Sequence, residues 1–194
     1  MIKLVEMTSP VKPALFFLNQ SRPTEEAFTQ INDIDALLRT VSYHITWIGG
    51  FGVWKSQLSL MPDFARHAEL KLIQVDALLR LVNISQNAYI CNLPMFQILP
   101  TGPKGGYNIA EIFGTNYLKI LQQFQNQISE ATMNALKKEV LVKHILPFYY
   151  SDIHDFGQID IEKHLPDFVN EPYFSSLLAS AKAQKEREDL KKFQ

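Results

Sequence analysis

Glycine is distributed unevenly along this chain of 194 residues. Six of its eight glycines fall into two clusters, which are Gly49, Gly50 and Gly52, and Gly102, Gly105 and Gly106. Both clusters lie at the ends of segments with strand-like composition, so they mark loops. Glycine in such a loop lets the backbone approach a ligand closely, and ligands of α/β sheets bind at strand ends. The alternative interpretation of each cluster is a tight turn.

The segments around the first cluster alternate between strand-like and helix-like patterns. The apolar run over 14–18 predicts a buried strand, and apolar residues at helical spacing predict a helix over 24–41. Residues 43–54 are rich in aromatic and β-branched side chains and predict a strand followed by a loop. A further helix is expected over 62–83, and residues 87–99 are expected to be extended. This alternation predicts a helix-rich α/β fold.

Helical patterns dominate the second half of the chain. Asn108 and Ser129 can each cap a helix, and the two helices are expected to pack as a hairpin. A last helix is predicted over 174–193, and its mixed charges are typical of a solvated tail. We expect one domain over 1–150, followed by an irregular segment and a charged C-terminal helix over 151–194.

Charge and cysteine content exclude several classes of partner. The 19 basic and 20 acidic side chains nearly cancel, so no broad positive field is expected to attract nucleic acid or an anionic membrane. Cys91 is the only cysteine, which leaves no intramolecular disulfide or cysteine-based metal cluster and suits a reducing compartment. No apolar run approaches the ~20 residues of a transmembrane helix. Cytoplasmic localisation is therefore expected.

Two tryptophans flank the first glycine cluster. The flat indole faces of Trp47 and Trp54 suit the apolar faces of sugar rings, and their N–H groups can donate to hydroxyls. A sugar pocket is one hypothesis. The other is that both tryptophans belong to the core, where most tryptophans lie.

Asp76 and the second glycine cluster are the other candidate functional features. Asp76 is an acid in an apolar helical stretch, where it could serve as a base or simply lie on the surface of an amphipathic helix. The segment from Lys104 to Asn108 offers a cation, backbone N–H groups and the start of a helix, which together suit a diphosphate. It does not match the phosphate-binding loop or dinucleotide-binding patterns.

Acidic and histidine residues near the C-terminus do not have metal-site spacing. They match none of the zinc, EF-hand or His-Glu-x-x-His patterns. These residues are Asp152, His154, Asp155, Asp160, Glu162 and His164.

The order of these motifs resembles the C-terminal half of family-2-type inverting glycosyltransferases of bacterial polysaccharide synthesis, over residues 14–125. The resemblance rests on the first strand and helix, on Trp47-Ile48-Gly49-Gly50, on Gln74-Val75-Asp76, and on Lys104-Gly105-Gly106-Tyr107-Asn108. It implies a partial GT-A-like sheet followed by C-terminal helices.

The resemblance also assigns roles to these residues. It implies that the acceptor saccharide is bound by Trp47, Gly49, Gly50 and Trp54, and that Asp76 deprotonates the acceptor hydroxyl. It implies further that the diphosphate of a nucleotide sugar is bound by Lys104, Gly105, Gly106 and Tyr107.

A GT-A enzyme carries its nucleotide-binding half before the region of resemblance. That half needs roughly 100 residues for its βαβ units, and only about 13 precede the first strand here. The resemblance implies a divalent metal, Mg²⁺ or Mn²⁺, but we find no ligands for it in the sequence. Asp33-Ile34-Asp35 has the Asp-x-Asp pattern but lies within a predicted helix, so we interpret it as structural.

We therefore expect a truncated glycosyltransferase that transfers sugar only with a partner chain supplying the missing half. The alternative is a non-catalytic carbohydrate-binding or protein-interaction module.

Overall fold

A computed structural model describes residues 6, 8–19, 26–97, 108–151, 161 and 163–191. It confirms that the chain is α/β and rich in helix, with one small mixed sheet. The strands are β1 (Ala14–Phe17), β2 (Phe28–Ile31), β3 (Phe51–Gly52) and β4 (Ala88–Cys91). The α-helices are α2 (Ile34–Val41), α3 (Ile73–Ser85), α4 (Tyr117–Gln122), α5 (Glu130–Val140), α6 (Leu146–Ser151) and α7 (Phe174–Lys191).

The sheet has the strand order β2-β4-β1-β3. The two central strands, β1 and β4, are parallel, with Ala14 paired to Ala88 and Phe17 to Cys91. The edge strands β2 and β3 are antiparallel to their neighbours. Because β1 and β4 are parallel, their carboxyl ends meet at the same edge of the sheet.

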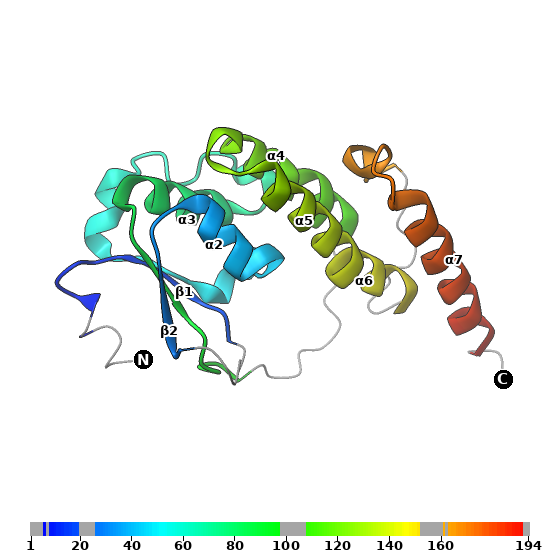
Figure 1. Ribbon diagram of the computed structural model, residues 1–194, viewed down its shortest axis with the longest axis horizontal. Coiled ribbons are helices and arrows are strands. Elements are labelled where there is room, and N and C mark those ends of the chain that lie inside the picture. Colours follow the sequence, from blue (N-terminus) through cyan, green and yellow to red (C-terminus); the bar gives the residue numbers. More distant parts are fainter. Residues whose placement is uncertain are drawn as a thin grey trace.

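Alternation along β1 divides the apolar side chains between the two faces of the sheet. Ala14 and Phe16 belong to the main core, which includes side chains of α2 and α3. Figure 1 shows both helices on the same side of the sheet. Leu15 and Phe17 belong to a smaller apolar cluster on the other face.

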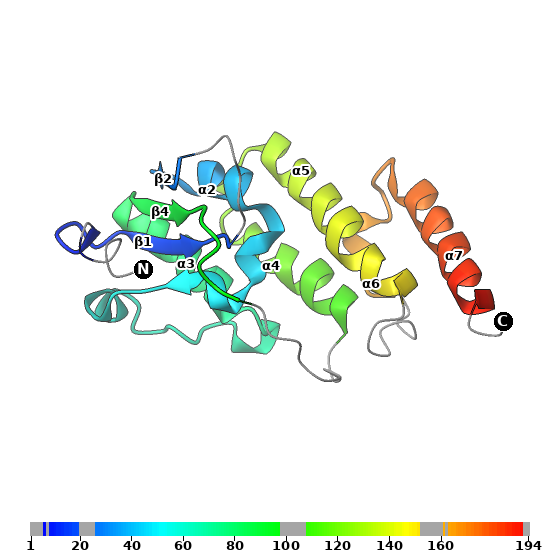
Figure 2. The same ribbon diagram turned by 90° about the horizontal axis from the view of Figure 1, so that it is seen from below.

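The remaining helices extend away from the sheet. A π-helical segment, η5 (Ala110–Asn116), leads into α4, and a second one, η7 (Leu141–Ile145), joins α5 to α6. α7 packs against α6, and Figures 1 and 2 both show it at the end of the molecule far from the sheet. Within the described residues, no helix has the length and apolar character needed to span a membrane.

The first predicted helix is partly wrong. Its N-terminal part, Phe28–Ile31, is the edge strand β2, and only Ile34–Val41 is helical. The Asp33 side chain ends the extended stretch by accepting a hydrogen bond from the Ala36 N–H at 2.7 Å, which caps α2. The pairing of β2 with β4 overrides the local helical spacing, because strand formation depends on cross-strand neighbours.

Two other predicted segments are longer than the elements that form. The helix expected from Pro62 begins only at Ile73, after turns in which His67 and Lys71 have positive φ angles of 59° and 61°. Of the residues expected to be extended after position 87, Ala88–Cys91 form the strand and the described part that follows is irregular. The helix caps predicted at Asn108 and Ser129 are confirmed.

The remaining short elements are 3₁₀-helices between these strands and helices. They are η1 (Ser42–Thr46), η2 (Ile48–Gly50), η3 (Lys55–Leu60), η4 (Ala68–Leu70), η6 (Gln125–Gln127) and η9 (Pro166–Phe168).

Candidate functional site

The carboxyl edge of the β1–β4 pair is organised by an asparagine. Asn19 follows β1 and has a left-handed backbone with a φ of 53°, a conformation that asparagine tolerates well. Its side-chain Nδ2 donates to the Phe96 carbonyl at 3.0 Å, and its Oδ1 accepts from the Phe96 N–H at 2.8 Å. Both backbone polar groups of Phe96 are therefore held by one side chain.

Phe96 in turn contacts Trp47. The two rings meet edge to face, with centroids 5.6 Å apart and planes at 81°. Phe96 makes a similar contact with Phe17 at the end of β1, with centroids 5.5 Å apart. Such aromatic pairs fix the orientation of both rings. Trp47 remains partly exposed at this edge of the sheet.

The two adjacent glycines make room for this arrangement. A Cβ at Gly49 would lie 2.9 Å from Cζ2 of Trp47, and a Cβ at Gly50 would lie 2.9 Å from Cε2 of Phe16 and 3.0 Å from the Phe17 carbonyl oxygen. A side chain at Gly49 would displace the Trp47 ring, and one at Gly50 would push the loop away from the carboxyl end of β1. These glycines therefore let the loop approach the protein's own aromatic rings and backbone.

Trp54 lies at the opposite end of β1. Its indole Nε1 donates to the carbonyl of Pro13, directly before β1, at 2.9 Å. Gln57 holds the same segment, because its Oε1 accepts from the Trp54 N–H at 2.9 Å and its Nε2 donates to the Lys12 carbonyl at 2.8 Å. Trp47 and Trp54 thus do not face each other across one pocket, and the Trp54 N–H is already used in the fold.

Asp76 is completely buried in α3 and is surrounded by arginines. Arg66 donates to both carboxylate oxygens, from Nη2 at 2.7 Å and from Nε at 2.9 Å. Nε of Arg80, one helical turn further along α3, lies 2.9 Å from Oδ2. A general base needs a lone pair directed at the hydroxyl group that it deprotonates. Asp76 could provide one only if Arg66 moved away.

Arg80 also reaches Asp63, so the four side chains form a chain of alternating charge. Its Nη1 lies 2.5 Å from Asp63 Oδ1, and this hydrogen bond lowers the pKa of the exposed Asp63 carboxyl. Sequence reasoning missed both arginines. The spacing of Asp76 and Arg80, four residues apart on one helix, was a signal that could have identified one of them.

The predicted donor-binding residues Lys104, Gly105, Gly106 and Tyr107 lie outside the described residues. Asn108 follows them and caps the next helix, because its Oδ1 accepts from the Glu111 N–H at 3.1 Å. Of the C-terminal acidic and histidine residues, only His164 lies in the described ranges.

The Asp-x-Asp pattern does not fit a divalent metal. The Asp33 carboxylate caps α2, and the Asp35 carboxylate accepts from the Ser129 N–H at 2.8 Å and lies 3.2 Å from Arg39. The two carboxylates therefore serve different structural contacts. Elsewhere in the described ranges, no three acidic, histidine or cysteine side chains gather as a metal site would require.

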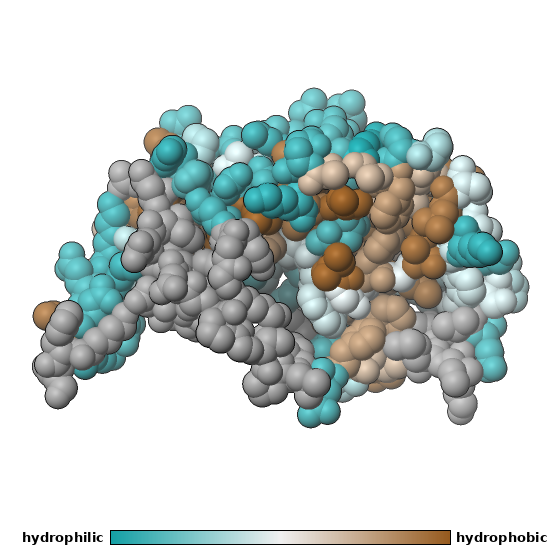
Figure 3. Space-filling model, turned by 180° about the vertical axis from the view of Figure 1, so that it is seen from behind, coloured by the Kyte–Doolittle hydropathy of each residue, from teal (hydrophilic) through white to brown (hydrophobic). Residues whose placement is uncertain are grey.

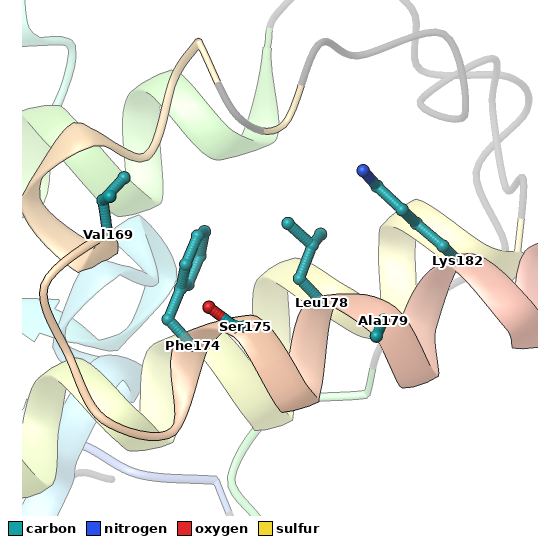
Figure 4. A pocket seen from close by; sticks show the side chains of 6 residues that line it. All are labelled: Val169, Phe174, Ser175, Leu178, Ala179 and Lys182. Carbon is teal, nitrogen blue, oxygen red and sulfur yellow. The ribbon is translucent and has the colours of Figure 1, made fainter.

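Several cavities lie in the helical part of the molecule. One of about 400 Å³ runs along α7. Figure 4 shows Phe174, Leu178 and Lys182 projecting from α7 into the same space, with Val169 at one end. None of the residues predicted to bind acceptor or donor lines this cavity.

Comparison with known proteins adds no family. No family model matches the chain, and neither the curated proteins nor the solved structures contain a match.

Proposed function

We propose that this chain is the acceptor-binding half of an inverting glycosyltransferase of the kind that it resembles. In this proposal the chain binds the acceptor saccharide, and another chain supplies the nucleotide-sugar site. Transfer of sugar then requires both chains, and the present chain alone is inactive.

The observation that supports this proposal is the position of Trp47. It is a partly exposed indole, oriented by Phe96 and Gly49, at the shared carboxyl edge of two parallel strands. That edge is where α/β sheets bind their ligands. A fixed aromatic face at such a place can stack on the apolar face of a sugar ring without losing side-chain entropy on binding.

Two observations bear on the roles proposed for Trp54 and Asp76. Trp54 is turned to the other end of β1, which leaves one tryptophan at the carboxyl edge. Asp76 is held by two arginines, so its proposed role as the base requires Arg66 to swing away when the complete enzyme assembles. Arg66 is the more exposed of the two arginines, which makes it the one that can leave.

The test uses the fact that the chain has two tryptophans. Trp54→Phe leaves Trp47 as the only tryptophan, and we expect its fluorescence to change saturably when oligosaccharides from bacterial polysaccharides are added. Trp47→Phe in the otherwise native chain should weaken binding of the same oligosaccharides, measured by isothermal titration, by roughly tenfold. The proposal fails if the native chain binds none of them, or if Trp47→Phe binds them as tightly.

The alternative function, a protein-interaction module, is favoured by one feature of the surface. Figure 3 shows apolar side chains gathered on one face of the half that contains the sheet. The exposed apolar residues of this half include Ile48, Leu58 and Leu60. Large exposed apolar patches commonly mark protein interfaces. A chain that binds no saccharide but self-associates, with Leu58→Lys abolishing the association, would support the alternative.

A further inference from the structure

The turn that joins α4 to α5 is unusually rich in side-chain amides. Five of the six residues from Gln122 to Gln127 carry one, and Phe124 is the exception. A side-chain amide is uncharged and both donates and accepts hydrogen bonds. Such groups match the hydroxyls of a polyol, which also donate and accept.

Two of these amides, Gln122 and Gln125, line a cavity of about 320 Å³. Asn134, from the first half of α5, adds a third amide to the lining. The apolar part of the lining includes Leu118 and Ile128, which are buried. The cavity therefore combines apolar side chains with several uncharged polar groups, and its size is near the lower end for small-molecule sites.

The charged groups at the cavity argue against an anionic ligand. Glu130 and Asp167 contribute two carboxylates to the lining. The single lining cation, Lys137, lies 2.5 Å from Glu171, so its charge is already paired. A phosphate or carboxylate ligand would meet net negative charge here, whereas sugar hydroxyls can donate to both carboxylates.

We propose that this cavity between α4 and α5 is a second binding site, for a neutral mono- or disaccharide. The amides and carboxylates hydrogen-bond the hydroxyls, and the C–H face of the sugar packs against the partly exposed Met133. The site shares no residue with the one at Trp47. It can therefore be tested separately from the proposed transferase function.

The chain offers matched variants to test this site. Gln122→Ala with Asn134→Ala removes two lining amides, whereas Gln123→Ala with Gln127→Ala removes two amides from the same turn that do not line the cavity. All four side chains are exposed, so neither pair should disturb the fold, which circular dichroism can verify. The probes are the methyl glycosides of glucose, galactose and N-acetylglucosamine, and maltose, with binding to the full chain followed by saturation-transfer NMR.

We expect at least one probe to bind saturably, the lining pair to weaken its binding roughly tenfold, and the matched pair to leave it unchanged. Trp47→Phe should also leave this binding unchanged. The inference is overturned if no probe binds, or if the lining pair binds as tightly as the native chain. Loss of all binding in Trp47→Phe would overturn it as well, while still supporting the site at the sheet.

Discussion

Asp76 lies in an environment that the sequence did not predict: it is completely buried between two arginines. A charged carboxylate in a fully buried position is stable only when it is paired and hydrogen-bonded. Arg66 donates hydrogen bonds to both carboxylate oxygens, and Arg80 adds a second positive charge 2.9 Å from Oδ2. The pairing links α3 to the turn that precedes it, so it fixes the path of the chain there.

Asp76→Ala should therefore destabilise the protein strongly. Removing the carboxylate leaves Arg80 largely buried without that partner, and we expect a loss of about 3 kcal/mol in the free energy of unfolding. Urea denaturation followed by circular dichroism measures this loss. Asp63→Ala is the matched control, because Asp63 pairs with the same arginine from an exposed position and should cost much less. Equal losses in the two variants would contradict a structural role for Asp76.

The burial of His144 makes the stability of the protein depend on pH. Its ring packs among Tyr43, Phe113 and Phe148, and its Nε2 has no hydrogen-bond partner in the described part of the chain. Burial, with a smaller contribution from the charge of His44, lowers the pKa of His144 from 6.5 to about 4.

Between these two pKa values the unfolded chain binds a proton that the folded chain excludes. Stability is thus complete above pH 6.5 and is lost as the pH falls towards 4. We expect the free energy of unfolding to fall by about 1–2 kcal/mol between pH 7 and pH 5 on this account. Urea denaturation at both pH values should show a smaller decrease for His144→Phe than for the native chain. An unchanged decrease would assign the effect to other groups.

At the scale of elements, helix caps account for where α2 and α5 begin. Asp33 caps α2, and the Ser129 hydroxyl accepts from the Thr132 N–H at 3.2 Å at the start of α5. Asp35 joins the two ends, because its carboxylate accepts from the Ser129 N–H. The sequence interpretation of this Asp-x-Asp as structural agrees with these contacts.

Asp33→Ala should shorten or fray α2. We expect a loss of about 1 kcal/mol in the free energy of unfolding, because Ala36 loses the acceptor for its N–H. Asp33→Ser keeps a capping oxygen and should restore most of the stability, which thermal denaturation can measure. If adding Mg²⁺ stabilised the native chain but not Asp33→Ser, the carboxylate would be a metal ligand rather than a cap.

At the scale of the whole molecule, a glycine in η5 allows the segment before α7 to pack against the helices. A Cβ at Gly114 would lie 2.5 Å from Cδ2 of Leu165, whose side chain is fully buried. The Thr115 hydroxyl donates to the His164 carbonyl at 2.8 Å beside this contact. The approach therefore depends on the absence of a side chain at position 114.

Gly114→Ala tests this dependence, because the packing decides whether the substitution stabilises or destabilises the protein. In an open helical position, alanine would stabilise by up to about 1 kcal/mol relative to glycine. Here the clash with Leu165 should instead destabilise the protein by about 1–3 kcal/mol. A double-mutant cycle with Leu165→Ala should show that the alanine at 114 is better tolerated once Leu165 is truncated. A stabilising Gly114→Ala would show that the two segments do not pack closely.

Local signals in the sequence determined much of the secondary structure. The apolar run of β1, the caps at Asn108 and Ser129, and the final helix all depend on neighbouring residues, so the sequence predicts them. The sequence also indicated the importance of Gly49 and Gly50, although the close approach that they permit is to the protein's own rings.

Only the tertiary structure decided which of these residues lie together. β2 is a strand because it pairs with β4, 57 or more residues away, and Asp76 is paired because α3 and the preceding turn bring two arginines to it. Trp47 and Trp54 are seven residues apart, yet β3 carries the chain along β1 between them and separates them to opposite ends of that strand. Contacts between distant residues depend on how elements pack, and local spacing carries no information about that packing.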